Sequence, residues 1–251
     1  MKASTIFPKI LKGALAALFW LGVWYLLAAV ISKPLFLPYP HDVLKRLFEL
    51  AVTAPFWKTV ALSSARIVWG WLLGLVIGGA LALLTHFVRF ADIIISPALR
   101  TVRAVPVVSF ILLMFLWMSN DAIPVFIALL MVVPIVWQNT ASGLAALDKN
   151  LSEMATVFRF SRALTLKKVI FPQLAPYLYS ASLTSLGLAW KSGIAAEVIS
   201  YPAVAIGAEM NAAKVSIETV DLFVWTVTVV AVSLIFEGIF RLILKRGGKK
   251  G

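Results

Sequence analysis

Cysteine is absent from this chain, and histidine occurs only twice, as His41 and His86. Without cysteine there is no disulfide framework, no thiolate metal ligand and no thiol nucleophile. The two histidines do not lie at a metal-ligand spacing from each other, which excludes the usual zinc motifs. The sequence therefore predicts no metal site, no cofactor site and no catalytic site.

Charged residues are also scarce, at 14% of the chain, whereas 61% of the 251 residues are hydrophobic and the mean hydropathy is +0.96. This apolar fraction lies well above that of soluble domains and argues against a water-soluble fold. The net charge of +12 is compatible with nucleic acid, an anionic membrane surface or orientation in a bilayer. Because the cations cluster between apolar runs, we interpret them as topology signals and predict no nucleic-acid partner.

Six apolar runs come close to the length of about 20 residues that crosses a bilayer. They lie at residues 13–31, 60–87, 105–118, 124–143, 174–190 and 222–244. The sequence thus predicts an all-α membrane protein with six transmembrane helices in the lipid bilayer. The first run could also be a secretory signal, but it is longer than the apolar core of a signal peptide. Its bulky Trp20, Trp24 and Tyr25 suit a retained span with interfacial aromatics.

The distribution of lysine and arginine predicts the orientation. Six spans place both termini on one side, together with the connections after the second and fourth spans. Most of the cations fall in these four segments: Lys2, Lys9, Lys12, Arg89, Arg100, Arg103, Lys149, Arg159, Arg162, Lys167, Lys168, Arg241, Lys245, Arg246, Lys249 and Lys250. We therefore expect a multi-pass membrane protein with both termini in the cytoplasm.

Two short connections on the opposite side have readable local structure. Residues 33–40 hold three prolines and predict an extended connector, and residues 41–51 carry apolar side chains at helical spacing. The latter predict a short amphipathic helix at the outer interface. A turn at residues 119–124 joins the third and fourth spans as an antiparallel pair.

The connection at residues 147–172 is long and amphipathic. Ser161 is placed to cap a helix that runs toward Ile170, and Pro172 is expected to stop or kink that helix as the chain re-enters the membrane. On these local features alone, a solvated basic loop accounts for the segment equally well.

The same connection resembles the EAA signature of ABC importer permeases, which reads Glu-Ala-Ala, three residues, Gly, nine residues, then Ile-x-Leu-Pro. The matching positions are Glu153, Met154 in place of the middle alanine, Ala155, Val169 and Phe171 in place of Ile and Leu, and Pro172. Arg159 replaces the glycine that permits a sharp turn between two short helices in the family. Since arginine tolerates a positive φ poorly, this departure predicts a reshaped turn.

Further segments look like permeases for nitrate, sulfonates, taurine and related small solutes: residues 37–44, 63–70, 103–106 and 187–197. The resemblance implies a MetI-like core of five helices at about 59–251, with an additional first helix and outer connector in residues 1–58. It also implies a location in the bacterial inner (plasma) membrane, a homodimer of permeases, two cytoplasmic copies of an ABC ATPase and an extracytoplasmic solute-binding protein. No phosphate-binding Gly-x-x-x-x-Gly-Lys-Ser/Thr motif occurs, so this chain is not predicted to be an enzyme.

The resemblance assigns contact with the ATPase to residues of the 147–172 connection: Ser152, Glu153, Met154, Ala155, Phe158, Arg159, Ser161 and Pro172. For Glu153 two roles stay open, namely contact with a basic group of the ATPase and local hydrogen bonds that hold the helix.

Lys191 and Glu197 form the second candidate site, because ionisable groups next to apolar runs are costly in lipid. Either they line the translocation path, or Lys191 reaches the outer headgroups or pairs with Glu197. The alternative function is a secondary transporter or channel without an ATPase. That reading requires intramembrane carboxylates or a selectivity ring, whereas the first, third and fourth apolar runs carry no charge.

Overall fold

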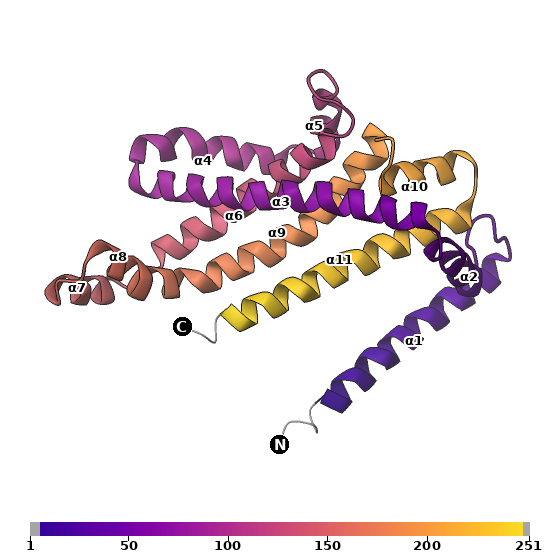
Figure 1. The fold of residues 1–251 in the computed structure, drawn as a ribbon, viewed down its shortest axis with the longest axis horizontal. Helices are drawn as coiled ribbons and strands as arrows, with labels where there is room; N and C mark the ends of the chain where they lie inside the picture. Colours follow the sequence, from indigo (N-terminus) through magenta and orange to yellow (C-terminus); the bar gives the residue numbers. More distant parts are fainter. Residues whose placement is uncertain (1–5, 248–251) are drawn as a thin grey trace.

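The computed structural model describes residues 6–247, and every regular element in this part of the chain is helical (Figure 1). In chain order the elements are α1 (Ile6–Ile31), α2 (Pro40–Ala51), α3 (Ala54–Phe87), α4 (Arg89–Ala104), α5 (Val107–Met114), α6 (Ile123–Ala145), α7 (Lys149–Val157), α8 (Arg162–Thr165), the π-helical turn η1 (Leu166–Ile170), α9 (Phe171–Ser200), α10 (Ile206–Val215) and α11 (Thr219–Gly247). The all-α prediction is confirmed. Helices α7 and α8 lie at one end of the molecule and α2 and α10 toward the other, which we name the α7 end and the α10 end.

Helices α3, α6 and α9 form the centre of the bundle, and glycines set how closely α3 approaches α6. Gly70, Gly74 and Gly78 recur on one face of α3. A Cβ atom at these positions would lie 2.4 Å from the carbonyl oxygen of Val125, 2.5 Å from Val132 Cγ1 and 2.7 Å from the carbonyl oxygen of Val133. This glycine stripe therefore packs against α6 within the subunit, as close helix contacts in membranes require.

The other two pairs of the central helices are closed in the same manner. A Cβ at Gly143 of α6 would lie 2.7 Å from Leu174 of α9, and one at Gly193 of α9 would lie 2.7 Å from Ile67 of α3. Each pair of these three helices thus has a glycine at its contact, and a larger residue there would force the two helices apart.

The third predicted span is not one straight helix, which corrects the sequence-based prediction. Residues 105–118 contain only the short α5, and α5 is bent by 100° from the preceding α4. Helix α4 lies along α3 and α6, where Leu99 packs in a cluster with Ala82 and Val133. The sequence-based prediction missed α4 because its sequence mixes charged and apolar residues. Its arginines were interpreted as topology signals in a connection and not as part of a helix.

By length and composition, three helices of the described residues are able to cross a membrane, and the bent pair α4 and α5 counts as a fourth if it forms one span. These three are α3, α6 and the part of α11 up to Ile243. Helices also occupy the predicted first and fifth spans, as α1 and α9. Among the described residues, Leu15–Ile31 is the continuous apolar part of α1, and α9 carries Lys191 and Glu197. Six crossings therefore remain a prediction.

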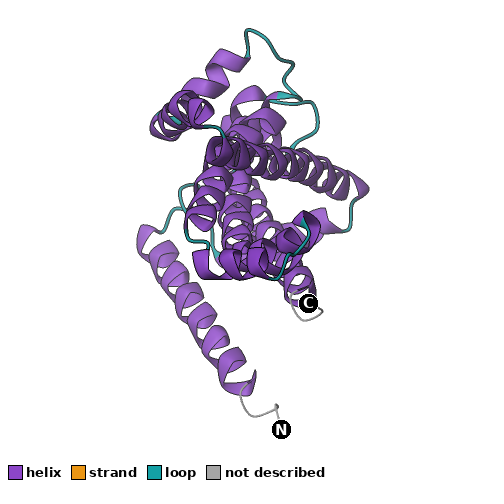
Figure 2. Cartoon of the chain, turned by 90° about the vertical axis from the view of Figure 1, so that its left-hand side faces the viewer, coloured by secondary structure: helices purple, strands orange, loops and turns teal. Residues whose placement is uncertain are grey.

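Helix α1 stands apart from the bundle along most of its length (Figure 2). It is held near its end at the connector, where Trp24 Nε1 donates to the carbonyl oxygen of Pro38 at 3.1 Å and the Trp24 ring lies 5.6 Å from the ring of Phe223. Helix α2 confirms the predicted amphipathic helix: it buries Val43 and leaves Phe48 exposed.

The predicted long connection is a compact pair of helices, α7 and α8, followed by η1. Pro172 does not stop the chain from being helical, because helical residues run without a break from Arg162 to Ser200. The proline lies in the first turn of α9, directly after η1, whose wider turn bonds the Phe171 amide to the Leu166 carbonyl. A π-helical turn accommodates the missing amide and the ring that an α-helix interior tolerates poorly.

The glycine stripe predicts a strong position dependence for alanine substitutions in α3. Gly74→Ala places a methyl group against both Cβ and Cγ1 of Val132, so we expect it to destabilise the folded chain by about 1–3 kcal/mol. Thermal unfolding of the purified chain in detergent measures this. Gly79→Ala is the matched control, because nothing lies within 4 Å of a Cβ there. Equal melting temperatures for the two variants would contradict the packing.

Candidate functional site

The α7–α8 segment at the α7 end is built around a reversed turn at Arg159, which has φ 52°. The Phe160 amide donates to the Ala155 carbonyl at 2.8 Å, and the Arg159 amide donates to the Thr156 carbonyl at 3.0 Å. This pair of bonds is the Schellman ending of a helix, whose left-handed residue is usually glycine. The prediction of a reshaped turn is therefore wrong: arginine adopts the left-handed conformation in spite of its Cβ.

Side-chain caps fix where the two short helices begin. Asp148 Oδ1 accepts from the Asn150 amide at 2.8 Å at the start of α7. Ser161 Oγ accepts from the Leu164 amide at 3.3 Å, which confirms the predicted cap of α8. Since each cap satisfies a free helix amide, the segment keeps its shape largely by local hydrogen bonds.

The outer surface of this segment exposes large apolar side chains beside its charged ones. Val157 is 78% exposed and Phe158 is 68% exposed, and Met154 is exposed beside them, whereas Ala155 is buried. Glu153 is exposed and makes no hydrogen bond or ion pair with the described residues, which disfavours its predicted alternative role in local hydrogen bonding. The side chain of Ser152 lies outside the described part of the chain.

A second polar cluster lies at the α10 end, around the fully buried carboxylate of Glu197. Glu197 Oε2 accepts from Ser63 Oγ at 2.8 Å and from the Gly207 amide at 3.1 Å. Ser63 Oγ in turn accepts from the Ile206 amide at 2.8 Å. Two free amides at the start of α10 are thus capped by side chains from α3 and α9, and the carboxylate lies at the positive end of the helix.

Arg66 of α3 extends this cluster toward the two adjacent loops. Its Nη1 donates to the Val204 carbonyl at 2.8 Å and lies 3.5 Å from Glu197 Oε1, and its Nη2 pairs with Asp121. Arg66 therefore has a structural role, because it joins α3 to the two adjacent loops and to Glu197 of α9. Glu197 is not the partner of Lys191. Its carboxylate pairs with Arg66 instead, and Lys191 is exposed and forms no ion pair with the described residues.

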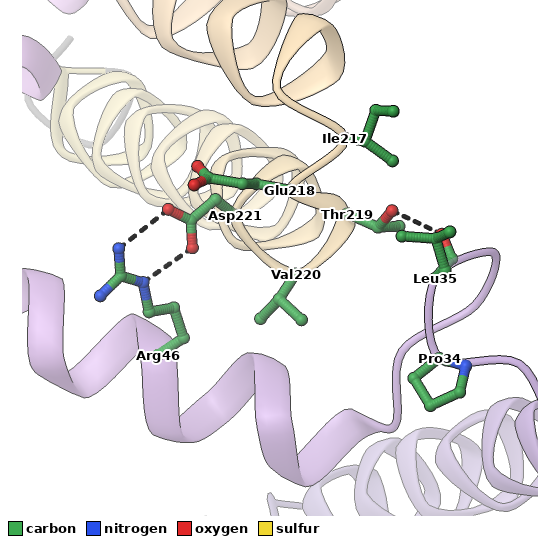
Figure 3. Close-up of a pocket in the computed structure, with 8 residues that line it drawn as sticks. All are labelled: Pro34, Leu35, Arg46, Ile217, Glu218, Thr219, Val220 and Asp221. Atoms are coloured by element: carbon green, nitrogen blue, oxygen red, sulfur yellow. Dashed lines mark hydrogen bonds and ion pairs between the residues drawn. The ribbon is translucent and has the colours of Figure 1, made fainter.

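A surface pocket of about 450 Å³ opens at the same end of the molecule, between the proline connector, α2 and the turn from α10 to α11 (Figure 3). Arg46 forms a two-pronged ion pair with Asp221, at 2.7 Å from Nε to Oδ1 and 2.9 Å from Nη2 to Oδ2. These bonds to Asp221 raise the pKa of the Arg46 guanidinium above its ordinary value. At the rim, Ile217 adopts φ 60°, which is unusual for a β-branched residue. Sequence reasoning missed this pocket, because Arg46 and Asp221 are far apart in the chain.

Residues 70–247 match the family described as binding-protein-dependent transport system inner membrane component. The chain belongs to this family. As a permease it resembles a putative aliphatic sulfonates transport permease protein, SsuC, of Bacillus subtilis (strain 168), with 28% identity over 75% of this chain and 69% of the relative. The taurine transport system permease protein TauC of Escherichia coli (strain K12) is 27% identical over 74% of this chain and 70% of the relative.

The bicarbonate transport system permease protein CmpB of Synechococcus elongatus is 26% identical over 61% of this permease, and the match covers 55% of that relative. The fold is also that of a solved structure described as an amino acid ABC transporter with histidines. That structure has a TM-score of 0.63 at 16% identity, and the match covers 82% of this chain and 98% of the other. The prediction of a permease of the sulfonate and taurine type is confirmed.

The left-handed Arg159 predicts that glycine improves the turn. Arg159→Gly should stabilise the Schellman hydrogen bonds by about 1 kcal/mol, because it removes the Cβ clash. Hydrogen exchange at the Phe160 amide measures this as an about five-fold slower exchange rate. Arg159→Ala is the matched control, since it removes the charge and keeps the Cβ. An equal gain in the alanine variant would assign the effect to charge instead.

The buried cluster predicts that Glu197 is needed for stability. Glu197→Ala leaves Arg66, the Ser63 hydroxyl and the Gly207 amide without their shared carboxylate partner, so we expect a loss of about 3 kcal/mol. Thermal unfolding in detergent tests this, with the nearby exposed Glu218→Ala as control. Unchanged melting of the Glu197 variant relative to the control would show that the cluster is not stabilising.

Proposed function

We propose that a separate cytoplasmic ATPase binds the α7–α8 segment of this importer permease and moves the bundle through it. The observation that carries the proposal is the exposed apolar surface of Met154, Val157 and Phe158 on a segment whose shape is fixed by its own caps. An exposed apolar patch next to basic residues fits a protein partner better than it fits water. Glu153, exposed and free of local bonds, is available to a basic group of that partner.

The proposed orientation places the α7 end in the cytoplasm with both termini. Helix α11 ends on the side of the molecule where α7 and α8 lie, and the start of α1 points the same way (Figure 1). The cationic connection at residues 149–168 then lies inside, as lysine and arginine in short loops prefer. The α10 end with its pocket faces outward, where an extracytoplasmic binding protein would deliver the solute.

For the solute we propose a small molecule with an acidic group. The relatives are named for the transport of aliphatic sulfonates, taurine and bicarbonate, which are anions or carry an anionic group. We further propose that a second copy of the permease closes the path. The exposed Lys191 faces that path, whereas Glu197 supports it from behind by positioning α10.

The proposal predicts that a charge at the tip of α7 disrupts ATPase binding. Phe158→Asp should weaken the partner ATPase at least about ten-fold and lower solute-stimulated ATP hydrolysis, because an apolar contact is replaced by a carboxylate. Affinity purification of the complex with quantitation of the retained ATPase measures this. The control is Val52→Asp at the α10 end, where Val52 is 86% exposed.

Two results would count against this function. If the Phe158 variant retains as much ATPase as the Val52 variant, the partner does not bind at the α7 end. If the purified permease alone moves solute across liposomes without ATP, it is a secondary transporter or a channel.

A further inference from the structure

Two arginines of α4 occupy an unusual position in this fold. Arg100 and Arg103 are both exposed on the single chain. Neither forms an ion pair with a described residue, and the one carboxylate of α4, Asp92, accepts a hydrogen bond from Ser96 instead. Two full positive charges therefore lie on one side of a bundle helix without a counter-charge among the described residues.

The depth of these arginines follows from the packing of α4. At a rise of 1.5 Å per residue, Arg100 lies about 16 Å from the start of α4, which is as far as Val76 lies from the end of α3. Helix α4 runs back along α3, and Leu99 packs in a cluster with Val133, which lies near the middle of α6. Arg100 is thus level with the centre of the spanning helices, and Arg103 lies about one turn farther toward the α10 end.

Arginine at this depth requires water or a counter-charge. The hydrocarbon layer is about 30 Å thick, so a headgroup lies about 15 Å from its centre, which is beyond the reach of an arginine side chain. Charged residues inside membrane proteins almost always face a water-filled cavity or a partner group. An arginine that faces lipid at this depth without water or a counter-charge is therefore excluded by the free energy that its desolvation requires.

We propose that Arg100 and Arg103 line the aqueous path of the assembled transporter and bind the anionic group of the solute. The planar guanidinium offers paired N–H donors that match the oxygens of a carboxylate or sulfonate group. Two cations one turn apart attract an anion and disfavour a cation in the same passage. This inference rests on the proposed function, since the path is closed only in the assembled permease.

The absence of cysteine makes single-cysteine labelling a direct test. Arg100→Cys, Arg103→Cys and Val76→Cys are made separately in the full chain within its native membrane complex. Each is treated with an anionic sulfonatoethyl or a cationic trimethylammonioethyl methanethiosulfonate reagent. Val76 is the matched control, because it is 71% exposed and apolar at the same level of α3. We expect both arginine positions to react with the anionic reagent at least about ten-fold faster than the Val76 position.

A second pair of variants tests the charge itself. In the Arg103→Cys background, Arg100→Gln should lower the ratio of anionic to cationic labelling about ten-fold, whereas Arg100→Lys should keep most of it. Labelling after denaturation in SDS counts the total thiol and shows that each variant is present.

Three outcomes overturn the inference. The arginine positions could react as slowly as Val76, which would place them in a closed protein interface. They could react without preference for charge, or keep that preference in the Arg100→Gln variant. The labelling needs no ATP, so it is independent of the ATPase test. If the Phe158→Asp variant retains the ATPase while anion-selective labelling is intact, the ATPase assignment is rejected and the arginine path is not.

Discussion

The close approach of α3, α6 and α9 is the constraint on which the rest of the structure depends. Lipid is as apolar as leucine, so these helices gain little from burying apolar surface and must gain from tight contact instead. Gly70, Gly74 and Gly78 allow that contact between α3 and α6, while Gly143 and Gly193 allow it at α9. The three helices therefore behave as one body, and any change of access to the path has to occur around them, at α4, α5 or the junction between subunits.

The polar and charged groups described above lie at different levels along the bundle axis. At the α10 end, Glu197, Ser63 and Arg66 join α3, α9 and α10 through hydrogen bonds that are shielded from water. At the α7 end, the caps at Asp148 and Ser161 shape a segment that leaves its apolar residues outside. Between the two ends, α4 carries Arg100 and Arg103, which form no ion pair with a described residue. The buried ion-pair cluster, the proposed partner contact and the proposed solute contact thus lie at different places along the bundle.

The sequence predicted the elements whose signal is local and strong. The apolar runs predicted the long helices, and the apolar spacing after the proline connector predicted α2. Ser161 predicted the start of α8. Helix α4 was missed because its arginines imitate a cytoplasmic connection. The Arg46–Asp221 and Arg66–Glu197 pairs were also out of reach, because partners that distant in the chain are brought together only by packing. The turn at Arg159 was misjudged for a different reason: two backbone hydrogen bonds outweigh a Cβ penalty of about 1–2 kcal/mol.

That turn also determines how a force travels through the protein. Its two hydrogen bonds fix the direction of α7 relative to α8 within a few residues. The connection between the two helices is therefore a rigid turn and not a flexible linker. A pull on α7 reaches the uninterrupted helical stretch from Arg162 to Ser200 with little lost to bending at the joint. This stretch ends beside the start of α10, so under the proposed function a displacement of α7 by the ATPase would be passed along it to the α10 end.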